Sequence, residues 1–307
     1  MMGTHQCYRF AGYIDNVYRA SLLITGQPQF VTQDDTGTGD GIPPIPEWQA
    51  VDPGIAAQVL QADIPELQSS ITSIDPPVLN VFLRLREVLQ QAQTRREQHN
   101  TPFPSTRLHD LACFVAHRLL QGNSPANIPT LLSSPLTECI RFATVLYILI
   151  VQGPTYYPHA ALLGNLVSHL IKSLECLWSA PTVIQLPPQQ DPPPSNRLGL
   201  VATSLSQDTA EQGRIQIPLP YIYSSLDIWI LSVGMVAAAT SSTPSHYQWF
   251  LASPTAQEAA AFLGIGNGCD ALVHVKRVLW LETTYGQGGE MFRQCWDGML
   301  TGLGMLP

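Results

Sequence analysis

Residues 136–151 read Leu-Thr-Glu-Cys-Ile-Arg-Phe-Ala-Thr-Val-Leu-Tyr-Ile-Leu-Ile-Val, and this stretch decides the fold. Ser134-Pro135 precedes it, Gly153-Pro154 follows it, and positions 142–151 carry no charge. A helix that is apolar all round must be covered on every side. The stretch is too short to cross a bilayer, which takes about 20 apolar residues. We therefore expect residues 136–151 to be the central helix of a helical domain.

Further helical patterns flank this central stretch on both sides. Apolar residues recur at steps of three and four, and the alternation and hairpin turns of a sheet do not recur. Such patterns cover residues 8–25, 78–92, 105–119, 158–177, 225–239, 244–251, 254–263, 270–280 and 291–300. The sequence predicts an all-α fold, a single helical domain of roughly ten helices around the apolar central helix.

Composition divides the chain into three parts. Residues 1–30 contain an amphipathic helix, which we expect to dock on the rest of the chain. Its apolar stripe is Phe10, Tyr13, Ile14, Val17, Tyr18 and Leu22. Residues 31–74 are an acidic Gly/Pro linker with a short helix, and the linker is irregular from Val31 to Gly54. Residues 75–307 form the main helical domain, interrupted by a Pro-rich surface loop at 180–220.

The two segments with the least charge are predicted to be neighbours. Residues 136–151 and 225–239 are both nearly uncharged, so each needs cover on all sides. As helices they would have similar lengths, about 24 and 22 Å. We expect them to pack against each other, with Gly234, Ala237 and Ala238 leaving room for close approach.

The charge balance argues against direct contact with nucleic acid. Of the 307 residues only 12% are charged, against about 25% in a typical globular protein. The net charge is −8 and the only lysines are Lys172 and Lys276, so a basic face is lacking. The segment that comes closest to a basic stripe contains Arg84, Arg86, Arg95 and Arg96, but it also contains two glutamates. We expect no DNA binding and no membrane segment.

The six cysteines indicate a reduced, intracellular protein without a metal centre. The shortest interval between them is 26 positions, and no basic region followed by an apolar core marks the N-terminus as a signal peptide. The most suggestive metal spacing is His109, Cys113 and His117, because residues four apart share a helix face. Three such ligands would span about 12 Å along one helix, too far for one ion. We expect no bound zinc, with Cys113 buried and the histidines at its margins.

Two other motifs resemble those of enzymes. Asp34-Asp35 resembles the aspartate motif of helical terpene cyclases, but it lies in the predicted linker and position 38 is Thr rather than an acid. Gly264-Ile-Gly-Asn-Gly268 lacks the glycine spacing and the preceding strand of a nucleotide loop, so we expect a helix–helix turn. No catalytic, cofactor-binding or metal-binding residue is assigned. Glu138 and Arg141 are expected to form an ion pair at the start of the central helix.

Three patches together resemble a known family. The first is Glu138-Cys-Ile-Arg141, which runs into an apolar helix with Tyr147. The second is residues 226–237, Leu-Asp-Ile-Trp-Ile-Leu-Ser-Val-Gly-Met-Val-Ala, followed by Trp249-Phe250. The third is residues 275–280, Val-Lys-Arg-Val-Leu-Trp, and then Phe292-x3-Trp296. This order, over roughly residues 75–303, resembles the fungal-specific transcription factor domain, the helical regulatory region of fungal zinc-cluster regulators.

The resemblance implies regulation of transcription in the nucleus. The family's zinc-cluster DNA-binding module needs six cysteines in two close groups, which this chain lacks. The implied function is therefore an effector or dimerisation domain, part of a longer regulator or a stand-alone coregulator, without enzymatic activity or cofactor. Its implied partners are the transcription machinery or a DNA-binding regulator, a second copy of the chain, and a small-molecule effector. The alternative is a helical enzyme or small-molecule-binding protein of fungal specialised metabolism.

Overall fold

The computed structural model describes residues 46–65, 71–99, 105–120, 134–152, 160–179, 222–281 and 287–302. Within these ranges the chain forms eleven α-helices, a short 3-10 helix and no strand, which confirms the predicted all-α fold. The α-helices are α3 (Pro46–Gln49), α4 (Pro53–Asp63), α5 (Pro76–His99), α6 (Ser105–Leu120), α7 (Pro135–Gln152), α8 (Ala160–Ser179), α9 (Ser225–Thr240), α10 (Pro244–Ala252), α11 (Pro254–Phe262), α12 (Gly268–Val278) and α13 (Gln287–Thr301). The 3-10 helix η2 is Ile71–Ser73.

The chain divides into two compact units. Met1–Trp178 and Tyr223–Pro307 form the first, and Ser179–Ile222 form the second. Of the second unit only the two end residues are described, so the predicted Pro-rich loop lies outside the described residues. The predicted helix at 8–25 lies outside them as well.

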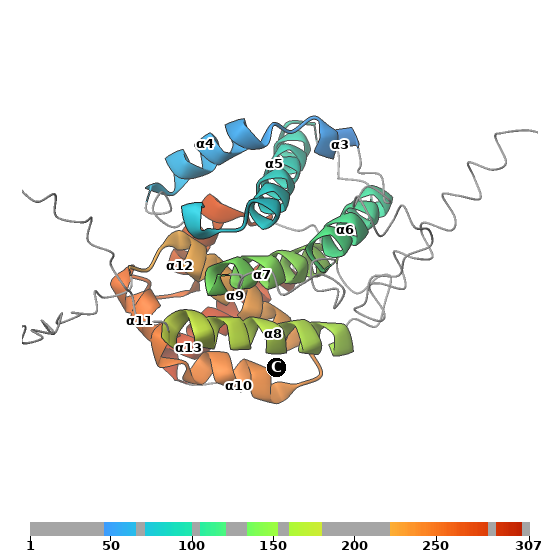
Figure 1. Cartoon of the computed structure of the whole chain (residues 1–307). Coiled ribbons are helices and arrows are strands. Elements are labelled where there is room, and N and C mark those ends of the chain that lie inside the picture. The colour runs from blue at the N-terminus through green and yellow to red at the C-terminus, as the bar shows by residue number, and fades with distance from the viewer. Residues whose placement is uncertain are drawn as a thin grey trace, which may run out of the picture. The chain divides into compact units, whose positions relative to one another are not determined.

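Helices α7 and α9 lie at the centre of the first unit (Figure 1). They pack against each other as predicted, and the rings of Tyr147 and Trp229 meet at a centroid distance of 5.8 Å. Helices α5 and α6 cover α7, while α10, α11, α12 and α13 pack on α9. The expectation that this stretch is too short to cross a bilayer is wrong, because α7 has 18 residues and is long and apolar enough to do so. However, 83% of it is buried inside the protein. Packing against these neighbours therefore accounts for its apolar sequence.

Gly234 makes room for a different neighbour from the one expected. A Cβ atom built on Gly234 would lie 2.4 Å from Cζ of Phe250 in α10 and 3.1 Å from Cδ2 of Leu170 in α8. The space beside Gly234 is therefore filled by α10 and α8, not by α7. The sequence shows that a small residue is present, but not which helix approaches it.

The predicted linker is wrong at its C-terminal end. The sequence suggests irregular structure up to Gly54, whereas α3 begins at Pro46 and α4 at Pro53. Trp48 is buried, with its ring edge-on to Phe114 of α6 at 5.0 Å. Both short helices pack on α5 and belong to the same core. The Gly- and Pro-rich composition suggests a linker, but Trp48, Val51 and Leu60 of this segment are buried in the core.

Helix α12 is capped three residues before Asp270, which is the other good capping residue of this segment. Asn267, not Asp270, accepts the backbone N–H groups at positions 269 and 270. Asp270 instead turns back and accepts the N–H of Gly266 at 3.0 Å. The segment 264–268 is the expected helix–helix turn, and Gly264 adopts a φ of +69°, which favours glycine.

Candidate functional site

The three patches that carry the family resemblance meet at residues 279–281, directly after α12. The indole N–H of Trp229 donates to the carbonyl oxygen of Leu279 at 2.7 Å. The backbone N–H of Leu281 donates to the hydroxyl oxygen of Tyr147 at 2.8 Å. The ring of Trp280 lies 5.8 Å from that of Tyr147 and 4.8 Å from that of Phe292 in α13. We call Tyr147, Trp229, Trp280, Phe292 and Trp296 the aromatic junction.

The buried polar groups of the junction have partners. The indole N–H of Trp296 donates to the hydroxyl oxygen of Ser232 at 2.9 Å, and that hydroxyl donates to the carbonyl oxygen of Ile228 at 2.6 Å. Burial raises the pKa of Tyr147 above its ordinary value, so this hydroxyl stays protonated near neutral pH. The junction thus fixes the segment 279–281 against three helices and offers a neutral, hydrogen-bonded core rather than an acid or a base.

An open groove of about 700 Å³ lies on the other side of this segment. One wall is the C-terminal half of α5, and the other is the end of α12 with residues 279–281. Its described lining residues are Glu87, Gln90, Gln91, Gln93, Thr94, Arg95, Glu97, Lys276, Leu279, Trp280 and Leu281. Because Trp280 belongs to both, the groove and the aromatic junction share a wall.

The groove is polar but electrically balanced. Its lining holds two carboxylates, Glu87 and Glu97, and two cations, Arg95 and Lys276. The side-chain amide of Gln91 donates to Oε1 of Glu87 at 2.9 Å. The side-chain amide of Gln93 donates to Oε1 of Glu97 at 2.6 Å. No described lining residue is a cysteine, histidine or serine. These groups can bind a ligand by hydrogen bonds and by contact with Trp280.

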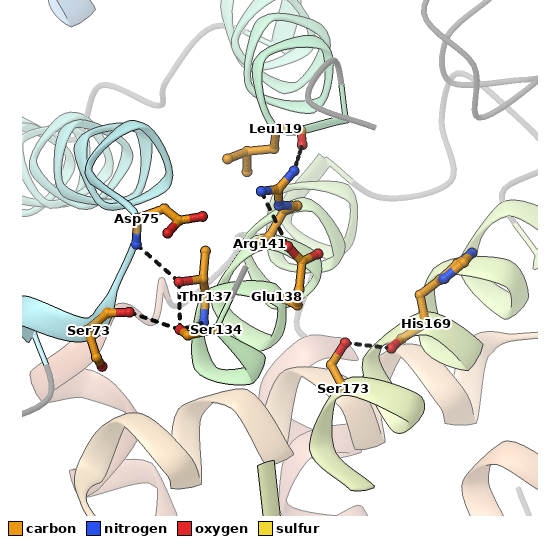
Figure 2. A network of polar contacts seen from close by, with 9 residues as sticks. All are labelled: Ser73, Asp75, Leu119, Ser134, Thr137, Glu138, Arg141, His169 and Ser173. Carbon is orange, nitrogen blue, oxygen red and sulfur yellow. Dashed lines mark hydrogen bonds and ion pairs between the residues drawn. The ribbon is translucent and has the colours of Figure 1, made fainter. Parts of the chain in front are cut away.

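The predicted ion pair at the start of α7 is confirmed (Figure 2). Nη2 of Arg141 lies 3.3 Å from Oε1 of Glu138, and Nη1 of Arg141 donates to the carbonyl oxygen of Leu119 at the end of α6. In the same region the hydroxyl oxygen of Thr137 accepts the backbone N–H of Asp75, just before α5. These contacts fix how α5, α6 and α7 meet, so we interpret them as structural.

Of the three residues on α6 whose spacing resembles a metal site, His109 and Cys113 lie close together. Nε2 of His109 lies 3.7 Å from Sγ of Cys113, and Nδ1 of His109 lies 2.6 Å from Nε2 of Gln152 in α7. His117 is buried further along the helix. In the part of the chain that the structure describes, no group of three or more His, Cys, Asp or Glu residues could hold a metal ion. Asp34 and Asp35 lie outside the described residues.

Two of the four arginines that come nearest to a basic stripe are used by the fold. Arg86 is buried and donates to the carbonyl oxygens of Val278 at 2.6 Å and Arg277 at 3.0 Å, at the C-terminus of α12. It also forms an ion pair with Asp63 of α4. Arg84 donates to the carbonyl oxygen of Trp48 at 2.7 Å. A cation at a helix C-terminus compensates the helix dipole, so Arg86 serves packing.

Sequence reasoning missed several residues of the groove and the junction. Gln90 and Gln91 of α5 carry no motif, and they become neighbours of Trp280 only in the folded chain. The pairing of Trp296 with Ser232 likewise joins positions 64 apart. The sequence shows the recurring aromatic residues, but it does not show which residues they contact. Comparison of the chain with protein families, with curated proteins and with solved structures found no match.

Proposed function

We propose that this chain is a transcription-regulatory helical domain of a fungal regulator, or a stand-alone coregulator, that acts in the nucleus through protein partners. The observation that supports the proposal is the aromatic junction. The patches of the resemblance span positions 138–296, and their aromatic residues converge on one segment, 279–281. In this role the chain catalyses no reaction and needs no cofactor.

The convergence supports the proposal because it is specific. Large aromatic residues of any all-α protein gather in its core, so burial alone carries little weight. Here Trp229 and Tyr147 also hydrogen-bond the backbone of Leu279 and Leu281, which lies far away in sequence. Motif residues that fix one another in this way are expected when the motif describes a fold family and not a chance composition.

The charge distribution supports action through proteins rather than through DNA. The net charge is −8, and Arg84 and Arg86 are engaged in helix packing. A duplex-binding face needs several cations directed at phosphates. The proposed domain is therefore recruited to DNA by a protein partner.

A tethering experiment tests the proposal. The full chain is fused to an unrelated DNA-binding module and expressed in a fungal cell with a matching reporter gene. We expect reporter expression to change severalfold relative to the module alone, and a fluorescent fusion of the chain to accumulate in the nucleus. Val273→Gln, at an exposed position of α12, is the matched control and should keep the effect. A folded, accumulated fusion that leaves the reporter unchanged contradicts the proposal.

The groove favours a second candidate, a small-molecule-binding helical protein of fungal metabolism. Its volume suits a small ligand, and it joins amide groups to the ring of Trp280. Native mass spectrometry of the chain purified from a fungal host would detect a bound small molecule. The variant Gln90→Trp, which fills the groove from the partly exposed face of α5, should lose that mass, whereas Val273→Gln should keep it. Absence of any bound species in the unsubstituted chain counts against this candidate.

A further inference from the structure

The more buried part of the groove wall on α5 is formed by amide groups. The partly buried lining residues of this helix are Glu87, Gln90, Gln91 and Gln93. The remaining charged residues of the lining are exposed, and they are Arg95, Glu97 and Lys276. Exposed charges of both signs add little to binding in water. A ligand is therefore selected mainly by three amides and one carboxylate.

Two of these amides have their orientation fixed by carboxylates. Gln91 donates to Glu87 through Nε2, and Gln93 donates to Glu97 in the same way. A carboxylate only accepts hydrogen bonds, so both amides use their nitrogen and keep Oε1 as an acceptor. Thr94 contacts the backbone carbonyl oxygen of Gln90 and not its side-chain amide, which has no partner among the described residues. This wall is thus rich in acceptors, and a ligand must supply donors.

Residues 279–281 supply the apolar part of the lining. Trp280 and Leu281 are partly exposed, while Leu279 is buried. The ring of Trp280 also contacts the rings of Tyr147 and Phe292, at centroid distances of 5.8 and 4.8 Å. A ring that is already held in place offers apolar surface without losing much side-chain entropy on binding. The groove therefore combines a fixed indole ring with an acceptor-rich wall.

We propose that the groove binds a neutral oligosaccharide. A pyranose ring carries hydroxyl groups around its edge, which both donate and accept, and C–H groups on its faces. The hydroxyl groups match the acceptors of Glu87, Gln90 and Gln91, and a C–H face matches the ring of Trp280. The inference rests on the second candidate function, ligand binding in the groove, and assigns that ligand a chemical class.

Other classes of ligand match this lining less well. A phosphate or carboxylate ligand only accepts hydrogen bonds, so it would meet the acceptors of the α5 wall with no proton between them. An organic cation would meet the positive charges of Arg95 and Lys276. A peptide or protein partner needs a larger contact with more apolar area at its centre, whereas the described lining offers one aromatic ring and two leucines.

Saturation-transfer NMR of the full chain with maltotriose, cellotriose, mannotriose and xylotriose tests the proposal. We expect at least one of these sugars to bind with a Kd of about 1 mM or tighter. Saturation should be strongest at the C–H protons of one ring face, because that face contacts Trp280. Raising NaCl from about 0.05 to 0.5 M should change the Kd by less than about twofold, since a neutral ligand is not screened.

Substitutions of Gln90 locate the binding site. Gln90→Leu keeps the size of the side chain but loses its amide, and it should weaken binding about 3- to 10-fold. Gln90→Trp fills the groove and should abolish binding. The matched control Gln257→Leu makes the same change at an exposed position of α11, outside the lining, and should leave the Kd unchanged. Both leucine variants keep a residue that favours helices, so their folds should be retained.

Three results would overturn the oligosaccharide proposal. They are the absence of binding by all four sugars at about 10 mM, binding that persists in Gln90→Trp, and binding that salt weakens severalfold. Native mass spectrometry of the chain from a fungal host separates this failure from that of the candidate function. A bound species that is not a sugar and is lost in Gln90→Trp retains the candidate function and overturns the ligand class. A chain that carries no bound species and binds none of the sugars overturns both.

Discussion

Helices α9 and α4 are both nearly free of charge, but only α9 is covered on every side. Asp227 is the only charged residue of α9, and Asp63 is the only one of α4. In α9 every residue from Ser225 to Ala238 is buried, whereas α4 buries one face and exposes Ile55 and Val59. Lack of charge therefore does not by itself predict burial. Whether such a helix is buried on all sides depends on the size of its side chains and on the helices that pack against it.

The neighbours of α9 explain its complete cover. Helices α7, α10, α11, α12 and α13 pack on it, and Phe250 of α10 and Leu170 of α8 fill the space beside Gly234. Helix α4 carries Gln58 and Gln61 beside its alanines, so its outer side can remain in contact with water. Four substitutions test the complete cover of the α7–α9 pair against the one-sided cover of α4.

The largest effect is expected from a charge placed in the central pair. Leu146 in α7 is fully buried, so Leu146→Asp loses apolar contacts and buries an unpaired carboxylate. We expect the free energy of unfolding to fall by about 4 kcal/mol or more. Leu146→Met is the control of similar volume and should cost less than about 1.5 kcal/mol. Urea unfolding measures both, and a loss below about 1 kcal/mol for Leu146→Asp means that α7 is not covered.

The next effect tests the close approach at Gly234. A methyl group at this position overlaps the Phe250 ring, so Gly234→Ala should cost about 2 kcal/mol although alanine favours helices. The double variant Gly234→Ala/Phe250→Leu should cost less than the sum of its single changes. Gly289→Ala in α13 is the matched control, because nothing lies within 4 Å of its Cβ; it should stabilise by about 0.5–1 kcal/mol. Strict additivity at positions 234 and 250 contradicts the contact.

A third, pH-dependent effect tests the aromatic junction. Tyr147→Phe removes the acceptor of the Leu281 N–H and should cost about 1–2 kcal/mol at pH 7. Burial raises the pKa of Tyr147 in the folded chain, while the unfolded residue ionises near pH 10. The stabilisation by the protonated hydroxyl is thus complete below pH 10 and is lost as the pH rises. At pH 11 the difference between the two proteins should shrink by about 1.4 kcal/mol.

The comparison of the two proteins at both pH values isolates Tyr147. Burial also raises the pKa of Cys139 and Cys295, the latter to about 11, and these thiols contribute alkaline sensitivity to both proteins alike. Their contribution therefore cancels in the difference. Equal differences at pH 7 and pH 11 show that the hydroxyl is not buried in the junction.

The smallest effect is expected at the start of α4. Asp52→Ala removes the acceptor for the N–H groups of Gly54 and Ile55 and should cost about 1 kcal/mol. Asp52→Asn keeps an acceptor and should cost a few tenths of a kcal/mol. Because α4 is covered on one side only, hydrogen exchange should accelerate in α4 and not in α9. Faster exchange in α9 indicates that the two helices unfold as one unit.

The sequence predicts most of the helices because each carries its own signal. Apolar periodicity indicates α5 to α13, and the lack of charge in residues 136–151 and 225–239 predicts their packing. The Glu138–Arg141 ion pair follows from spacing on one helix. In contrast, Asn267 and Asp270 are both good caps, and the structure shows that Asn267 caps α12 while Asp270 accepts the N–H of Gly266. Trp48 and Val51 show that a segment whose composition suggests a linker can still bury side chains in the core.

The candidate site was less predictable because its parts are distant in sequence. The groove joins positions near 90, which carry no local motif, to the resemblance patch at 275–280. His109 meets Gln152 across 43 positions, so the fate of its imidazole depends on how α6 packs on α7. Periodicity shows that a face is buried; the partner that covers it emerges only from the packed structure.

Arg86 has a consequence for the order in which the chain is synthesised. Its guanidinium is held by carbonyl oxygens at positions 277 and 278, and the bond to Val278 spans 192 residues. At a translation rate of about 5–20 residues per second, those acceptors follow Arg86 out of the ribosome by roughly 10–40 s. Over that interval α4 and α5 can pair Arg86 with Asp63 but cannot complete its shell. The buried side chain of Arg86 therefore gains its last two acceptors only once α12 has been synthesised.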